Sequence, residues 1–150
     1  GGGTNQAIGE YSSISGGYYG KASGSNSAVS GGSRNIASGL MSSVSGGGLK
    51  WVKGNEASGD YSSISGGYFN EAIGDTSSIS GGRSNKASGE YSSVTGGQEN
   101  LATKSDASVS GGLRNEANGV ASSISGGRSN VASAYYSSVT GGYIWRILLH

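Results

Sequence analysis

Cysteine and proline are absent from the 150 residues, and the only histidine is the last residue, His150. Without cysteine there is neither a disulfide framework nor a thiolate metal site. Without an internal histidine, the sequence offers no nucleophile and base that could act together. We therefore expect no enzymatic activity, no cofactor and no metal ion.

Charged residues are also scarce, at 13% of the chain with a net charge of +1. The ten basic residues are scattered, which argues against nucleic acid or an anionic membrane as a partner. No signal peptide is recognisable, and no apolar run approaches the roughly 20 residues that span a bilayer. Glycine is abundant, with 31 residues, and a composition rich in glycine and serine is typical of flexible linkers.

A strict repeat argues against a linker. Gly-Gly pairs recur every fifteen residues, and the single longer gap of twenty lies between Gly46 and Gly66. After the opening Gly1-Gly2, the pairs begin at Gly16, Gly31, Gly46, Gly66, Gly81, Gly96, Gly111, Gly126 and Gly141. A fixed period with one tolerated insertion indicates a stacked array in which the insertion forms a loop.

Two positions of each repeat are apolar and lie between small polar residues, which predicts two short strands per repeat. The branched column consists of Ile14, Val29, Val44, Ile64, Ile79, Val94, Val109, Ile124 and Val139. The alanine column consists of Ala7, Ala22, Ala37, Ala57, Ala72, Ala87, Ala102, Ala117 and Ala132.

We therefore predict an all-β fold, a β-solenoid (parallel β-roll) of about nine to ten 15-residue rungs. The repeat domain covers 1–142, with a loop insertion at about 48–54, and 143–150 form a C-terminal cap or assembly segment. Rungs about 4.8 Å apart would build a rod of about 45 Å. Because each rung contributes little apolar area, stability must come from stacking and from association with other chains.

An asparagine column runs from Asn5 to Asn130 and is broken only by Gly20. Asparagine and glycine both tolerate the left-handed conformation, and stacked amides can hydrogen-bond along a ladder. We therefore expect left-handed backbone at this column and an amide ladder through the stack.

Two stretches recur in each repeat, one represented by Ser13–Gly16 and the other by Ala72–Ser77, and they look like the two strands and bends of a known repeat. Both resemble, as a fifteen-residue variant, the YadA-like head repeats of trimeric autotransporter adhesins, over Gly1 to about Gly142. The resemblance implies a left-handed roll of three chains, located extracellularly or at the cell surface. It implies an adhesin head that binds host matrix, glycan or a cell surface. Similar repeats in phage tail fibres imply the alternative of a structural shaft or filament.

Two features interrupt the regular surface and are candidate contact sites. In the insertion, Lys50, Trp51 and Lys53 would protrude on a loop, although Trp51 could instead cover a gap in the stack. The two positions after each Gly-Gly would form a ridge, in which Tyr18, Tyr19, Tyr68 and Phe69 could grip a glycan or protein. The competing interpretation is a solvated edge where tyrosine and arginine lie over neighbouring rungs.

The last eight residues depart from the repeat. We expect them to cap the stack or to form an assembly contact, because an exposed sheet edge invites uncontrolled pairing; a fragment or an altered reading frame would give the same loss of pattern. The candidate assembly residues are Tyr143, Ile144, Trp145, Ile147, Leu148 and Leu149.

Columns of serine and threonine flank the branched column and would face outward. A flat ladder of hydroxyl groups suggests a third function, ice binding, although the columns hold mainly serine, with Thr95, Thr140 and the interruption Ala28 as departures. The calcium-binding nonapeptide roll fits less well, since its aspartate is replaced by a neutral asparagine in this repeat.

Overall fold

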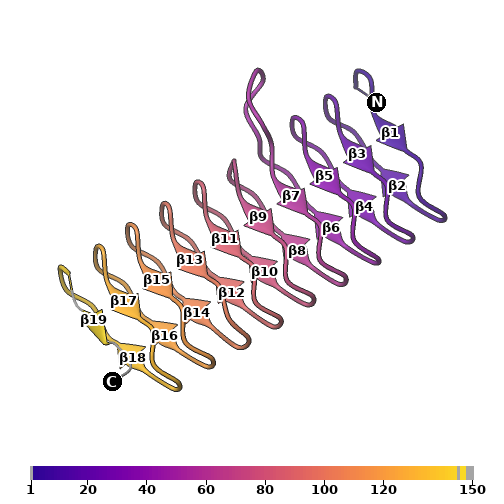
Figure 1. The fold of residues 1–150 in the computed structure, drawn as a ribbon. Helices are drawn as coiled ribbons and strands as arrows, with labels where there is room; N and C mark the ends of the chain where they lie inside the picture. The colour runs from indigo at the N-terminus through magenta and orange to yellow at the C-terminus, as the bar shows by residue number, and fades with distance from the viewer. Residues whose placement is uncertain (1, 145, 148–150) are drawn as a thin grey trace.

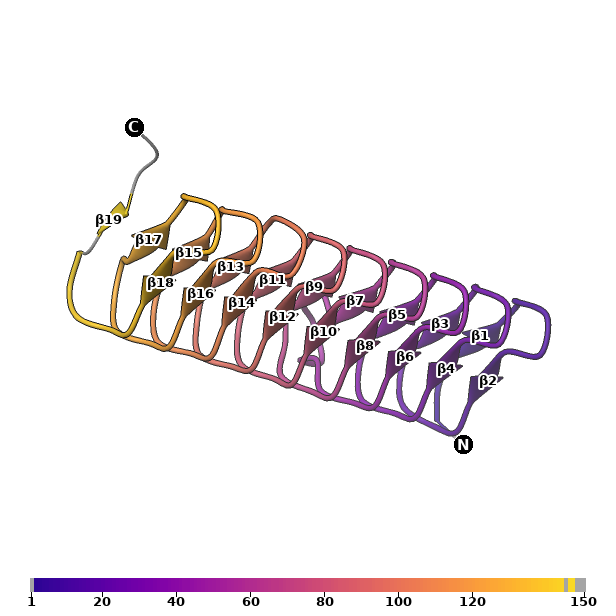
Figure 2. The ribbon, with the colours of Figure 1, turned by 90° about the horizontal axis from the view of Figure 1, so that it is seen from below.

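The computed structural model describes residues 2–144, 146 and 147, and it confirms an all-β solenoid in which each repeat forms one rung. Every rung contributes two short strands, and each strand pairs in parallel with its counterparts in the rungs before and after it. The rungs form a straight stack whose first and last rungs lie at opposite ends (Figures 1 and 2). Within the described residues no helix capable of crossing a membrane is present.

The alanine column lies in a sheet of ten strands. Its strands are β1 Gln6–Ala7, β3 Lys21–Ala22, β5 Ile36–Ala37, β7 Glu56–Ala57, β9 Glu71–Ala72, β11 Lys86–Ala87, β13 Leu101–Ala102, β15 Glu116–Ala117, β17 Val131–Ala132 and β19 Arg146–Ile147.

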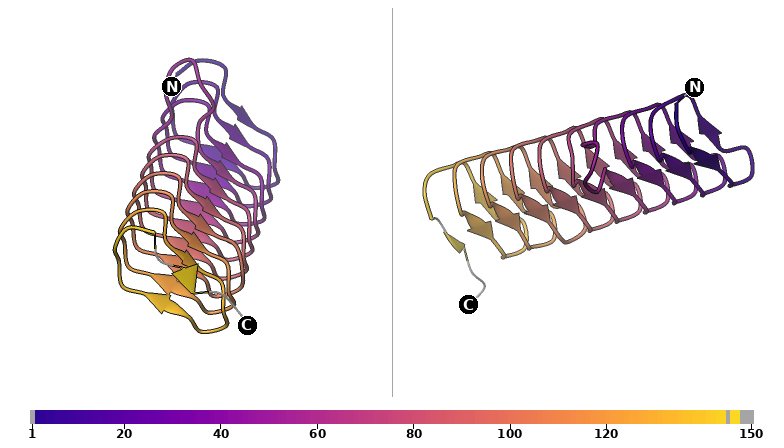
Figure 3. Two further views of the ribbon diagram at one scale, coloured as in Figure 1. Left: turned by 60° about the vertical axis from the view of Figure 1, so that its left-hand side comes forward. Right: turned by 90° about the horizontal axis from the view of Figure 1, so that it is seen from above.

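The branched column lies in a sheet of nine strands. Its strands are β2 Ser13–Ile14, β4 Ala28–Val29, β6 Ser43–Val44, β8 Ser63–Ile64, β10 Ser78–Ile79, β12 Ser93–Val94, β14 Ser108–Val109, β16 Ser123–Ile124 and β18 Ser138–Val139. Two bends connect the sheets. The first bend contains Gly-Gly and the asparagine column, and the second bend follows the alanine strand (Figure 3).

Most rungs bury two polar residues beside their two apolar ones. From Ala22 to Val139 the alanine and branched columns are at most 5% exposed, which confirms the predicted core. The asparagine column from Asn35 to Asn130 is equally buried. A serine column at the end of the second bend, for example Ser42 and Ser122, is buried too. The core is therefore about half polar, and its buried asparagines are stabilised by hydrogen bonding within the stack.

The buried asparagines form a hydrogen-bonded ladder. The Asn85 backbone N–H donates to Asn70 Oδ1 at 3.0 Å, and Asn85 Oδ1 accepts the Asn100 N–H at 3.0 Å. The Asn85 Nδ2 donates to the carbonyls of Gly81 (2.9 Å) and Gly97 (3.0 Å). The expected amide ladder is thus present, and each asparagine ties two rungs together.

The left-handed backbone expected at the asparagine column is instead found elsewhere. None of the ladder asparagines, nor Gly20, has positive φ; the second glycine of each pair does, as at Gly82 with φ +90°. Most rungs also have two non-glycine positions with φ between +51° and +59°. They directly precede the asparagine column, as Phe69 does, or lie in the second bend, as Thr76 does. The coil geometry imposes this conformation on polar, charged, aromatic and aliphatic residues alike, although it costs roughly 1–2 kcal/mol for non-glycine residues.

The glycine of the second bend is required by close packing rather than by φ. A Cβ on Gly74 would overlap the backbone carbonyl of Gly89 in the next rung. Two rungs nevertheless carry Lys104 and Ala134 at this position, so the second bend can widen locally.

The C-terminal segment continues the stack through its described residues. Tyr143 forms a bridge with Arg128, and β19 pairs in parallel with β17, Arg146 opposite Val131 and Ile147 opposite Ala132. Tyr143 and Ile144 are exposed. Trp145, Leu148 and Leu149 lie outside the described residues, and the cap or assembly role of the segment stays a prediction.

Candidate functional site

The ridge, defined as the two positions after each Gly-Gly pair, follows one edge of the solenoid. Its first positions form parallel bridges from rung to rung, including Gly3 with Tyr18, Tyr18 with Ser33, and Tyr68 with Arg83. The ridge side chains are therefore spaced by one rung, about 4.8 Å. Only the insertion interrupts this register, between Ser33 and Tyr68.

Aromatic and arginine side chains pack together on both sides of the insertion. Tyr18 and Tyr19 form an edge-to-face pair with ring centroids 4.4 Å apart, and the Arg34 guanidinium lies 5.1 Å from the Tyr19 ring. Tyr68 and Phe69 form a similar pair at 5.7 Å. The contact of Arg34 with Tyr19, and that of Arg83 with Tyr68 at 5.9 Å, cross from one rung to the next. The aromatic groups are therefore held in place before any partner arrives.

The insertion forms a loop that extends beyond the neighbouring bends between β6 and β7 (Figure 1). Its two ends are glycines packed on the preceding rung: a Cβ on Gly48 would collide with the Ser33 carbonyl, and one on Gly54 with the Arg34 carbonyl. Trp51 is 72% exposed, and Lys50 Nζ lies 5.4 Å from its ring centroid. The tryptophan therefore faces solvent and does not fill a gap in this chain.

Lys53 holds the loop against the sheet. Its Nζ lies 2.5 Å from Glu71 Oε1 and 3.0 Å from Glu56 Oε2, and Lys86 Nζ lies 3.5 Å from the other Glu71 oxygen. The hydrogen bond from Lys53 holds the pKa of Glu71 below its usual range, against partial burial, which raises it. Burial by itself would lower the pKa of Lys53, but its bonds to Glu71 and Glu56 outweigh that effect and raise it. Lys53 is thus engaged in ion pairs with the sheet, whereas Lys50 and Trp51 extend into solvent.

The two edges of the solenoid carry opposite charge. The ridge and its loop hold Arg34, Lys50, Lys53, Arg83, Arg114 and Arg128, with Glu99 as the single acid. The second bend holds Glu10, Asp60, Asp75, Glu90 and Asp106, with Lys104 as its single base. Glu99 is neutralised by Arg114, whose Nε lies 2.6 Å from its carboxylate, and this hydrogen bond lowers the pKa of Glu99.

The second bend also exposes tyrosines that the sequence analysis did not single out. Tyr11 is 81% exposed, and Tyr61, Tyr91 and Tyr136 are at least 56% exposed. Three of them follow an acidic residue in the pattern Glu/Asp-Tyr-Ser-Ser, which was a visible signal. This acidic and aromatic edge is a second surface, opposite in charge to the ridge.

Two hollows contain polar and aromatic side chains together. The N-terminal hollow has a volume of about 330 Å³ and lies beside Tyr19, and it is lined by Thr4, Gln6, Tyr19, Gly20, Lys21, Arg34 and Ile36. The C-terminal hollow, of about 190 Å³, lies where Lys104 replaces the second-bend glycine, and it is lined by Lys104, Asn118, Gly119, Val120, Ser133 and Tyr135.

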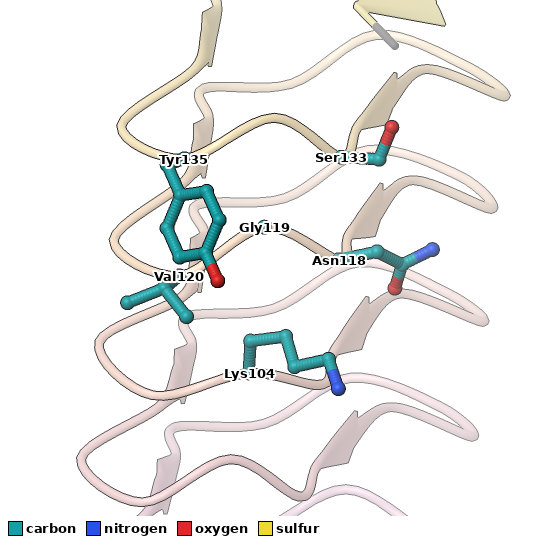
Figure 4. A pocket seen from close by; sticks show the side chains of 6 residues that line it. All are labelled: Lys104, Asn118, Gly119, Val120, Ser133 and Tyr135. Atoms are coloured by element: carbon teal, nitrogen blue, oxygen red, sulfur yellow. The ribbon is translucent and has the colours of Figure 1, made fainter. Parts of the chain in front are cut away.

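The C-terminal hollow is less suited to a ligand. Figure 4 shows the Tyr135 ring above Val120, with Lys104 in the rung below. Asn118 is already engaged, because its Oδ1 accepts a hydrogen bond from Thr103 at 2.8 Å and its Nδ2 donates to Glu116 at 3.1 Å. Lys104 is therefore the single cation that lines the C-terminal hollow, and the Glu116 carboxylate lies close to Asn118.

The sheet of the branched column presents an uncharged face. On either side of the buried branched column, a column of serine and threonine faces outward; Ala28 interrupts one of them. Ser123 Oγ donates to Ser138 Oγ at 3.2 Å, so the hydroxyl groups of these two neighbouring rungs contact each other. Among the described residues, no group of three or more His, Cys, Asp or Glu side chains could hold a metal ion.

Comparison with known proteins identifies no relative, since no family model matches the chain and no curated protein is significantly similar to it.

Proposed function

We propose that the protein is a surface-displayed or secreted adhesin head that binds host matrix, glycan or a cell surface through the ridge and its loop. The exposure of Trp51 supports this proposal most directly. A tryptophan that is 72% exposed on a protruding loop contributes nothing to the core of its own chain. Tryptophan, tyrosine and arginine dominate the binding energy of protein interfaces.

The scaffold around Trp51 suits recognition. Two aromatic pairs, at Tyr18–Tyr19 and Tyr68–Phe69, lie on the same edge on either side of the loop. They are fixed by contacts between rungs, so binding would cost little further ordering of side chains. A rigid scaffold with variable groups on its bends is how many binding proteins present their contact residues. The resemblance to adhesin head repeats adds support.

A second candidate function, the structural shaft of an extracellular filament or phage tail fibre, is favoured by the charge of the two edges. A basic ridge and an acidic second bend share one rung spacing, so two copies could align side by side with opposite charges facing. A contact between two different edges of identical chains can close into a ring, such as a trimer, or continue into a filament. The uncharged hydroxyl face would permit close packing and is also the basis of the third alternative, ice binding.

The adhesin proposal is tested by the attachment of protein-coated beads to mucin-coated, collagen-coated and epithelial-cell surfaces. Trp51→Ala should reduce attachment affinity by about 2 kcal/mol or more on the surface that the parent protein binds. Tyr61→Ala is the matched control, because Tyr61 is an exposed aromatic on the opposite edge. Equal attachment by the parent protein and Trp51→Ala would refute the proposal.

The shaft proposal is tested by light scattering at about 20 mM and about 500 mM salt. Because exposed charges are screened at high salt, assembly through the charged edges should weaken as salt rises. A monomer at both salt concentrations would exclude the shaft and the trimer together. A thermal-hysteresis measurement at millimolar protein tests ice binding. Absence of thermal hysteresis would exclude that function.

A further inference from the structure

The N-terminal hollow brings together two cations that have no acidic partners. Lys21 and Arg34 both line it, and neither forms an ion pair within the described part of the chain. Lys86 and Arg114 on the same surfaces are paired, with Glu71 and Glu99 respectively. Arg83 and Arg128 have no ion pair among the described residues, but they do not line this hollow. No carboxylate is among the residues that line the hollow. Two positive charges without acidic partners therefore line the same hollow.

The same hollow offers an aromatic ring and neutral polar groups. Tyr19 is 42% exposed, and its ring is held in position by Tyr18 at 4.4 Å and by Arg34 at 5.1 Å. Gln6 and Thr4 supply an amide and a hydroxyl group. Aromatic and neutral polar groups can bind a pyranose ring and its hydroxyls, and the two cations can bind an attached anion.

The volume of the N-terminal hollow suits a small organic molecule better than a simple ion. At about 330 Å³, the hollow falls in the range of sites that hold small organic ligands, of roughly 300–1,000 Å³. A lone sulfate or phosphate would leave most of it empty and would not use the tyrosine.

We infer that the N-terminal hollow binds an acidic sugar, a pyranose that bears a carboxylate or sulfate group. Lys21 and Arg34 bind the anionic group, Tyr19 packs against the ring, and Gln6 and Thr4 hydrogen-bond to hydroxyls. This inference rests on the proposed adhesive function, and it specifies the chemical class of glycan that the ridge recognises near the loop.

The test is isothermal titration of the full chain with a hyaluronan hexasaccharide, a heparin hexasaccharide and neutral chitohexaose. We expect at least one acidic oligosaccharide to bind about tenfold or more tightly than chitohexaose, with affinity that falls as salt rises. The double variant Lys21→Gln/Arg34→Gln should abolish this preference, and Tyr19→Ala should weaken acidic and neutral sugars alike.

Lys86→Gln/Arg83→Gln is the matched control. It also removes two positive charges, but from the next aromatic cluster, where Arg83 lies 5.9 Å from the Tyr68 ring centroid. Neither residue lines the N-terminal hollow. This control should retain the preference for acidic sugars. Circular dichroism of both double variants establishes that each is folded. An equal loss in both would contradict a localised site and indicate attraction by net charge alone.

Two further results would overturn the inference: no preference for either acidic oligosaccharide, or a preference that survives Lys21→Gln/Arg34→Gln. Full competition by inorganic sulfate at millimolar concentration would also overturn it, because it would indicate a simple anion site. Binding to phosphatidylserine vesicles without binding to either oligosaccharide would assign the cations to a lipid headgroup instead.

The bead assay with Trp51→Ala tests the proposed adhesive function separately. If Trp51→Ala lowers attachment and the double variant changes nothing, adhesion stands and the acidic-sugar site falls. If the double variant alone abolishes sugar preference while Trp51→Ala attaches normally, the sugar site stands and loop-mediated adhesion falls.

Discussion

The two bends of the solenoid turn the same chain by different means. In the first bend, a glycine at positive φ and a buried asparagine recur, and each asparagine amide bonds to neighbouring backbone. The second bend has no such amide ladder. Its left-handed position accepts tyrosine, methionine, threonine, aspartate and alanine, and its glycine gives way to Lys104 and Ala134.

This difference explains where the insertion could be accommodated. Across it, the ladder is unbroken, because the Asn55 N–H donates to Asn35 Oδ1 at 2.9 Å. The constraint on the first bend lies inside the coil, so its outward positions can vary and can carry a loop. The bend with the stricter interior therefore carries the insertion.

The largest effect is expected in the core that both bends enclose. Ile79→Asp places a charge where the parent side chain is 1% exposed. It should destabilise the protein by about 4 kcal/mol or more, measured by urea unfolding. Asp75→Ala, on the exposed second bend, should cost less than about 1 kcal/mol, since it removes one exposed hydrogen bond to the Asp60 N–H. Similar losses in the two variants would show that the branched column is not the core.

The glycines of the two bends provide the next comparison. Gly82→Ala in the first bend combines φ +90° with overlap of the Gly97 carbonyl and of the Asn85 amide. We expect a loss of about 3 kcal/mol in unfolding free energy. Gly74→Ala in the second bend should cost about half as much, because it needs no positive φ and this bend can widen. A larger loss for Gly74→Ala would reverse the comparison.

The amide ladder itself is tested by Asn85→Ala. The substitution leaves the Gly81 carbonyl and the Asn100 N–H without their side-chain partner. At about 1–3 kcal/mol for each buried unsatisfied group, we expect a loss of about 2–3 kcal/mol in thermal or urea unfolding. Ser88→Ala, which removes a side chain outside the core, should be nearly neutral. A neutral Asn85→Ala would mean that the ladder does not stabilise the first bend.

The smallest effect concerns the attachment of the loop. Because the folded-state pKa of Glu71 is depressed, its bond to Lys53 contributes fully above the unfolded pKa of about 4.3. This contribution is lost as pH falls through the lower folded value. NMR titration of the Glu71 carboxyl should show its pKa rising in Lys53→Gln, while hydrogen exchange in 48–54 becomes faster. An unshifted Glu71 pKa in that variant would contradict the ion pair.

Much of the fold could be predicted because it follows from the period. The spacing of Gly-Gly defined the rungs, and the alternation around Ile79 and Ala87 defined the strands. The bends were harder, since alternation does not determine side-chain direction where the chain turns. For this reason Asn85 was assigned the wrong φ.

The candidate site was predictable in its composition but not in its pairing. The ridge and Trp51 were visible as departures from the repeat. The ion pairs of Lys53 with Glu56 and Glu71 depend on how the loop folds back, and the N-terminal hollow depends on side chains from three rungs.

Native-state hydrogen exchange tests the contrast between the bends most directly. The amides of Asn70, Asn85 and Asn100 are buried and donate to the asparagine of the preceding rung. They should exchange only through global unfolding. The amides of Thr76 and Tyr91 in the second bend are also bonded, at 2.7 and 2.9 Å, but belong to exposed residues, and we expect exchange about 100-fold faster. Equal protection in the two bends, or faster exchange at the asparagines, would contradict the account.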